Sequence, residues 1–127
     1  MIAGIGVDLC SISRIEGILN REGQDGPFFR RVFTPAEQAE AEHRHNKAEY
    51  YAARFAVKEA VYKAVAPHTS SGFDLRIVES LHHEDGSPYV SLHGSLSEFL
   101  QEAGIQALHL SVTTEGDSAL AFVTAEK

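Results

Sequence analysis

The sequence predicts a single α+β domain over residues 1–127, built from an antiparallel-rich sheet and one long central helix. Two pairs of short apolar segments are each joined by a run of turn-forming residues, which indicates two β-hairpins. Between Ala48 and Ala66 lies a stretch rich in alanine, glutamate and lysine that ends at Pro67, which is typical of a helix. The predicted helices and strands do not alternate regularly along the chain, and this order favours the α+β class.

The chain opens with a strand and an amphipathic helix. Residues 1–10 are apolar except for two glycines and Asp8, and this pattern predicts a buried strand. Ser11 or Ser13 is positioned to cap a helix. The apolar positions of that helix recur at helical spacing: Ile12, Ile15, Ile18 and Leu19.

Two further helices are marked by their starts. Thr34, Pro35 and Glu37 supply a capping threonine, a proline at the first helical position and a glutamate three residues after the cap, so a helix to about His45 is expected. The central helix follows. Its apolar stripe consists of Tyr51, Phe55, Tyr62 and Val65.

The second half of the chain is read as two hairpins that flank a short helix. The predicted strands are residues 75–82 and 88–93 around the turn 84–87, and residues 107–114 and 119–125 around the turn 115–118. Ser95 and Glu98 suggest a second capping box, and Gly104 is suited to close the helix that it opens. Repeats, low-complexity tracts and linkers are not apparent.

Composition limits the possible functions. The formal charge of −7 argues against broad nucleic-acid binding, because proteins that neutralise phosphates display a basic face. Four arginines balance four acids in residues 1–33, so this third is the better place to meet an acidic partner. Cys10 is the only cysteine, which excludes an internal disulfide and fits a cytoplasmic protein. The sequence shows neither a membrane span nor a signal peptide.

Three residues suggest phosphate chemistry. Asp8 is an acid within an apolar strand and therefore needs solvent or a partner; capping a helix is one alternative role. Glu59 and Lys63 are four residues apart on one helix face, which also fits an ordinary exposed ion pair. Two carboxylates from separate elements suit Mg²⁺, with water and phosphate oxygens as further ligands and a lysine to balance charge.

Other candidates carry weaker signals. Alternation places His109, Ser111 and Thr113 on one face of a strand, where they either meet solvent or contact a ligand. His82 and His83 lie next to each other at a hairpin end, which favours solvation over a metal tract. We expect surface positions for His43 and His45 and a structural role for Cys10.

Two segments resemble the signature motifs of the holo-[acyl-carrier-protein] synthase family. They are residues 4–8, Gly-Ile-Gly-Val-Asp, and residues 54–64, Arg-Phe-Ala-Val-Lys-Glu-Ala-Val-Tyr-Lys-Ala. Segments similar to those of the family also occur at residues 33–37, 86–89 and 109–111. The resemblance therefore extends over nearly the whole chain. It implies transfer of 4'-phosphopantetheine from coenzyme A to a serine of an apo acyl carrier protein, releasing adenosine 3',5'-bisphosphate.

The resemblance also implies roles for particular residues. Asp8 and Glu59 would bind Mg²⁺ at the pyrophosphate, and Lys63 would balance charge on the phosphates as the third catalytic residue. Coenzyme A would be contacted by Arg54, Lys63, Pro88 and His109. Whether a carboxylate or a metal-bound water takes the proton of the serine stays open.

Partners and assembly follow from the same family. Arg14 and Arg21 lie on the helix that docks the acidic carrier protein in this family. Small members form homotrimers with sites between subunits. Two departures are present: Thr114 replaces a histidine of the His-x-Ser-x-x-His motif, and residues 66–72 lack most of the usual glycines. They leave a non-catalytic coenzyme A or carrier-binding subunit as an alternative, and a magnesium-dependent phosphohydrolase is another.

Overall fold

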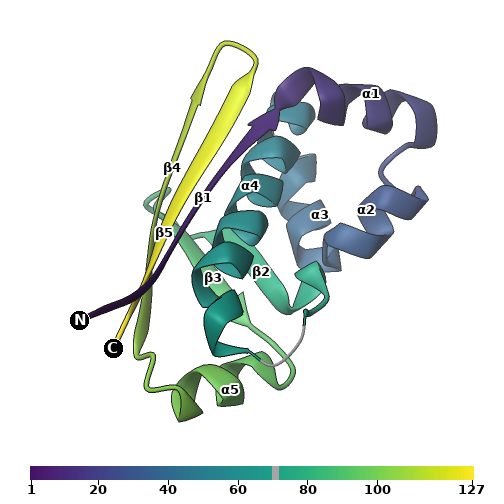
Figure 1. The fold of residues 1–127 in the computed structure, drawn as a ribbon. Coiled ribbons are helices and arrows are strands. Elements are labelled where there is room, and N and C mark those ends of the chain that lie inside the picture. The colour runs from purple at the N-terminus through teal and green to yellow at the C-terminus, as the bar shows by residue number, and fades with distance from the viewer. Residues whose placement is uncertain (70–71) are drawn as a thin grey trace.

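A computed structural model describes residues 1–69 and 72–127, and it confirms the α+β class (Figure 1). The N-terminal half contains β1 (Ile2–Ser11), α1 (Ile12–Glu22), α2 (Pro27–Val32), α3 (Pro35–Glu42), α4 (Lys47–Val65) and a 3₁₀ turn, η1 (Ala66–His68). The remaining elements are η2 (Leu75–Ile77), β2 (Val78–His82), β3 (Pro88–Leu92), α5 (Leu96–Glu102), β4 (Ala107–Glu115) and β5 (Ser118–Glu126). Within the described part of the chain no helix is both long and apolar enough to cross a membrane.

The strands form two antiparallel sheets. The larger sheet has the order β1-β5-β4, so the last strand in the sequence lies between the other two, and β2 pairs with β3 separately. α1 to α4 and the smaller sheet all lie on one side of the larger sheet (Figure 1). Its other face carries apolar side chains that this chain leaves exposed, namely Ile5, Val7, Leu9 and Phe122. The prediction that residues 1–10 form a buried strand is therefore wrong for one face.

Glycines allow β1 to lie directly against α4. A Cβ added at Gly4 would be 1.9 Å from the carbonyl oxygen of Ala64, and one at Gly6 would be 1.8 Å from that of Ala60. Any side chain at these two positions would push the strand away from the helix, because a contact under 3.0 Å forces a displacement. The glycines of the first motif therefore set the spacing between β1 and the functional face of α4.

Helix starts are predicted well where the cap is local. The side chain of Ser11 accepts a hydrogen bond from Arg14 N–H at the start of α1, and Thr34 forms the predicted capping box with Glu37. The predicted box at Ser95 is wrong, because its side chain makes no capping hydrogen bond. Its backbone is already in the right-handed helical region, which is not the extended geometry of a capping residue.

Other differences concern element ends. α2 was not predicted, because its six residues follow a glycine-rich segment; it forms because Phe29 is fully buried against Phe33 and Tyr51. α3 ends at Glu42 instead of His45. The predicted strand 75–82 begins only at Val78, because the preceding residues form η2.

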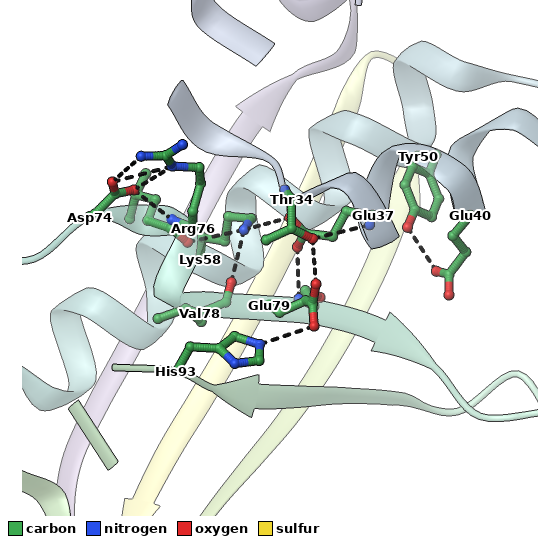
Figure 2. Close-up of polar contacts among 12 residues, drawn as sticks. Thr34, Glu37, Glu40, Tyr50, Lys58, Asp74, Arg76, Val78, Glu79 and His93 are labelled. Carbon is green, nitrogen blue, oxygen red and sulfur yellow. Dashed lines mark hydrogen bonds and ion pairs between the residues drawn. The ribbon is translucent and has the colours of Figure 1, made fainter. Parts of the chain in front are cut away.

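A buried ion pair joins α3, α4 and β2. Lys58 Nζ lies 2.8 Å from Glu37 Oε1 and donates to the carbonyl oxygens of Leu75 and Val78 at 3.0 and 2.8 Å (Figure 2). Glu37 Oε2 in turn accepts a hydrogen bond from Ser80 N–H at 2.7 Å. Both side chains are 0% exposed, but every ammonium proton and both carboxylate oxygens have partners, which offsets the cost of burying two charges.

Candidate active site

Asp8 and Lys63 meet where β1 crosses α4. Lys63 Nζ lies 3.1 Å from Asp8 Oδ1 and donates to the carbonyl oxygen of Val7 at 3.0 Å. The side chain of Asp8 is 17% exposed and that of Lys63 is 51% exposed. An ammonium group has three protons, so one N–H of Lys63 remains directed to solvent, where an anion can accept it.

Glu59 completes this corner as a half-buried carboxylate on α4. Burial and the negative charge of Asp8 raise the pKa of Glu59, and the charge of Lys63 partly opposes that shift. The alternative of an ion pair between Glu59 and Lys63 is not observed, because Lys63 pairs with Asp8. Asp8 also does not cap α1: Ser11 is the capping residue, and Asp117 of the β4–β5 turn accepts a further hydrogen bond from Ser13 N–H at 2.8 Å.

The donor set at this corner fits Mg²⁺. Mg²⁺ prefers hard oxygen ligands and binds through one or two carboxylates plus water and substrate phosphates. Burial first and the charge of Asp8 second raise the pKa of Glu59, and a cation beside both carboxylates would oppose both effects. Among residues 1–69 and 72–127 there is no group of three or more His, Cys, Asp or Glu side chains that could hold a metal ion. The solvation predicted at the hairpin end is wrong for His82, whose side chain is 17% exposed because it contacts Glu40.

Arg54 points away from that corner and toward β2. It is 2% exposed, it stacks 5.3 Å from the ring centroid of Tyr50, and its Nη1 lies 3.0 Å from the His82 ring. Arg54 and His82 form part of the wall of a cavity of about 480 Å³, together with Pro88 and Thr114. Burial lowers the pKa of Arg54, yet a guanidinium remains charged, so this wall is cationic.

His109 lies on the outer face of β4, as the alternation predicts. Its side chain is 60% exposed and its Nε2 is 3.3 Å from Glu126 Oε1. It lines a second cavity of about 520 Å³, together with Pro88. Pro88 borders both cavities, so it lies between the cavity lined by Arg54 and the cavity lined by His109.

The predicted site residues therefore fall into two groups. Asp8 is on β1, at one edge of the larger sheet, whereas His109 is on β4, at the opposite edge, and β5 separates them. Arg54 and Glu59 share α4 but lie about 140° apart around it, since each residue advances the helix by about 100°. The fold does not bring all predicted site residues to one point of a single chain.

The predicted docking arginines are both available. Arg14 and Arg21 are exposed on α1, and α2 adds Arg30 and Arg31, which are exposed as well. In the part of the chain that the structure describes, none of the four forms an ion pair. A chain with a net charge of −7 thus keeps four unpaired cations on two consecutive helices.

The remaining candidates lie outside the corner formed by Asp8, Glu59 and Lys63. Cys10 is 3% exposed and burial raises the pKa of its thiol, which disfavours the reactive thiolate and fits the predicted structural role. His43 and His45 are exposed, as expected. Thr114 donates to Glu49 at 3.3 Å. Part of the altered loop after the central helix, Ser70 and Ser71, lies outside the described residues.

Sequence reasoning missed two groups of polar residues. Lys58 stands inside the second motif, but nothing local distinguishes its buried direction from the exposed direction of Lys63. The second group is a contact of 2.9 Å between Glu40 and His82, a histidine that the sequence placed at a solvated hairpin end. Tyr50 extends it by donating to Glu40 at 2.8 Å (Figure 2). These residues are far apart in the sequence, so only the packing of α3, α4 and β2 reveals them.

Fold and site together define a phosphopantetheinyl-transferase type of protein. The family model described as the 4'-phosphopantetheinyl transferase superfamily matches residues 4–123, and the chain belongs to this superfamily. Within it, the chain is similar to proteins named holo-[acyl-carrier-protein] synthase, as the sequence motifs predicted. The one from Desulforudis audaxviator is 44% identical over 125 residues, which cover 98% of this chain and 93% of that relative.

Solved structures agree with this assignment. The crystal structure of holo-[acyl-carrier-protein] synthase from Neisseria meningitidis superposes with a TM-score of 0.86 at 38% identity and covers 100% of both chains. The ACPS–CoA complex of Chronobacterium ammoniagenes gives a TM-score of 0.81 at 30% identity, covering 97% of this chain and 96% of that one. The fold class expected from the sequence is thereby confirmed.

Proposed function

We propose that this chain transfers 4'-phosphopantetheine from coenzyme A to the serine hydroxyl of an apo acyl carrier protein and releases adenosine 3',5'-bisphosphate. The observation that carries the proposal is the corner of Asp8, Glu59 and Lys63, in a chain whose relatives are named holo-[acyl-carrier-protein] synthase. Phosphoryl transfer requires charge neutralisation and alignment of the attacking and leaving oxygens. The two carboxylates, through a bound cation, and the free N–H of the lysine are suited to neutralising the charge and to aligning the two oxygens.

Asp8 and Glu59 would hold Mg²⁺. When bound, the ion would neutralise charge on the pyrophosphate of coenzyme A. Lys63 would donate its free N–H to the phosphoryl group as charge develops there.

Coenzyme A would contact Arg54, Pro88 and His109. The cavity beside Arg54 offers a guanidinium for a phosphate group, and the cavity beside His109 has apolar walls that include Leu92, Ile105 and Leu108. A ligand that is part phosphate and part flat heterocycle needs such a pair of surfaces.

The two groups of site residues would be combined between copies of the chain, as a homotrimer. Metal ligands and coenzyme A contacts lie at opposite edges of the larger sheet, so a neighbour can place its β4 edge beside β1. The exposed apolar face of that sheet supplies the surface that association would bury. Replacing Val7 with aspartate should dissociate the assembly, measured by light scattering during gel filtration; an unchanged mass would contradict this.

The acidic carrier protein would dock on α1 and α2. Arg14 and Arg21 lack ion-pair partners in the described chain, so an acidic helix can pair with them without breaking existing contacts. We place the reaction in the cytoplasm, where the buried Cys10 stays reduced.

The decisive experiment combines the protein, coenzyme A, Mg²⁺ and a panel of apo carrier proteins, and measures carrier mass. We expect the carrier mass to increase by one phosphopantetheine group. Glu59→Ala should abolish this increase, whereas the exposed control Glu102→Ala should retain it. A carrier-independent release of adenosine bisphosphate would instead identify a phosphohydrolase. Coenzyme A binding without any adduct would identify a non-catalytic subunit.

A further inference from the structure

His82 lies between an acid and a buried arginine at the wall of the 480 Å³ cavity. Its Nδ1 is 2.9 Å from Glu40 Oε1 on α3, and Arg54 Nη1 on α4 lies 3.0 Å from both ring nitrogens. Arg44 Nη2 lies 3.1 Å from Nδ1. Glu40 is held in turn by Tyr50, whose hydroxyl donates to Oε1 at 2.8 Å. Three elements that are distant in the sequence thus meet in one chain of hydrogen bonds.

Glu40 and the two arginines make opposite demands on the His82 ring. A carboxylate only accepts hydrogen bonds, so the contact with Glu40 requires a ring N–H. A guanidinium only donates, and Arg54 Nη1 lies 3.0 Å from both ring nitrogens, so the contact with Arg54 requires a ring lone pair. The neutral ring has one N–H and one lone pair and can meet both demands, whereas the doubly protonated ring has no lone pair for Arg54.

Arg54 depends on this contact. Its side chain is 2% exposed, its Nε has no hydrogen-bond partner, and the face of its guanidinium lies on Tyr50. His82 is the side chain that accepts from Nη1 of Arg54 in the described structure. Without that acceptor, the guanidinium is free to rotate away from the cavity.

We propose that Glu40 and His82 are positioning residues that hold Arg54 at the cavity wall to receive a phosphate group of coenzyme A, and that protonation of His82 releases Arg54. This inference rests on the proposed function. A second proton on the ring would leave no lone pair for the guanidinium and would add a positive charge beside it, so an attractive contact would become a repulsive one.

The surroundings of His82 give the direction of the pH dependence. Glu40 and Arg44 face it from α3 and the following turn, Tyr50 and Arg54 face it from α4, and uncharged Pro88 pairs with it from β3. Burial and then the charges of the arginines lower the pKa of His82, while Glu40 opposes the shift. His82 is therefore neutral at neutral pH and becomes charged only as the pH falls through this lowered value.

The test compares His82→Gln with His93→Gln over a range of pH. Glutamine can donate to Glu40 and accept from Arg54 but does not titrate. His93 also contacts a glutamate, Glu79, at 3.1 Å, but it does not line either cavity, so it is a matched control. In the wild type and in His93→Gln, KM for coenzyme A should rise about tenfold at acid pH, as expected when a hydrogen bond to a charged group is lost.

In His82→Gln this rise should be much smaller, whereas kcat should follow the same pH profile in all three proteins. Titration of the phosphates of coenzyme A affects all three equally, so the difference isolates His82. An equally steep rise of KM in His82→Gln would overturn the proposal. Glu40→Gln should raise KM already at neutral pH, and an unchanged KM there would count equally against it.

A second measurement separates this inference from the proposed function. Nitrogen NMR of the wild type should show a neutral imidazole for His82 at neutral pH and a doubly protonated ring at acid pH, and calorimetry should show weaker coenzyme A binding at acid pH. Both readouts are independent of turnover, so they remain decisive if no carrier is modified. A His82 ring that is already doubly protonated at neutral pH, or binding that His82→Gln leaves equally pH-dependent, would refute the positioning role.

Discussion

Two lysines five residues apart on α4 form ion pairs of opposite character. Lys58 is fully buried against Glu37, and all of its protons are used within the chain. Lys63 is half-exposed against Asp8, and one of its protons is free. The two side chains have the same chemistry and charge. Lys58 stabilises the fold because it is buried with all three protons bonded, whereas Lys63 is available to a substrate because it is half-exposed with one free proton.

Breaking the buried pair should give the largest effect. Lys58→Met leaves the carboxylate of Glu37 buried without its counterion, which should lower the free energy of unfolding by about 3–5 kcal/mol. Urea denaturation followed by circular dichroism measures it. Lys63→Met, the matched control, should change stability by less than about 1 kcal/mol because its pair is partly exposed. Equal losses in both variants would show that the two pairs are not different in kind.

Removing the exposed lysine should mainly affect catalysis. Lys63→Ala is expected to lower kcat for phosphopantetheine transfer by about 10²–10³-fold, the usual range for one donor to developing charge. The unfolding curve should stay near that of the wild type. If transfer persisted at the wild-type rate, Lys63 would have no part in the reaction.

A smaller effect is expected at the cap that orients Glu37. Thr34 caps α3, and its backbone N–H donates to Glu37 Oε1 at 2.8 Å. Thr34→Ala should cost about 1 kcal/mol of stability. Ser95→Ala is the control, because Ser95 makes no capping hydrogen bond and its loss should leave thermal unfolding unchanged. A comparable cost in both variants would contradict the role given to Thr34.

The smallest expected change is a shift in titration. The charge of Asp8 contributes to the raised pKa of Glu59, so Asp8→Asn should lower that pKa, as measured by carbon NMR of the Glu59 carboxyl without Mg²⁺. In the wild type, Mg²⁺ affinity should fall as the pH decreases through the raised pKa, because the protonated acid is a poor ligand. An unchanged Glu59 titration in Asp8→Asn would mean that the two acids do not interact.

The sequence predicted what depends on near neighbours. Thr34 and Glu37 are three residues apart, so their capping box can be read directly, and the motif residues Asp8, Glu59 and Lys63 could be named in advance. The sequence did not predict that Asp117 accepts a hydrogen bond from Ser13 N–H at the start of α1, because Ser13 and Asp117 are distant in the sequence and only the sheet brings them together. The directions of Lys58 and Lys63 likewise depend on which neighbours α4 packs against, which periodicity alone does not reveal.

The position of β5 has a consequence for how the chain is made. It is the last strand in the sequence, yet it is the middle strand of the larger sheet and pairs with both β1 and β4. Its neighbour β1 emerges from the ribosome long before it, with the backbone groups that later pair with β5 still unpaired. Because long-range pairing must wait for the later segment, the sheet can close only after synthesis has passed β5, and until then β1 is a segment that chaperones are suited to bind.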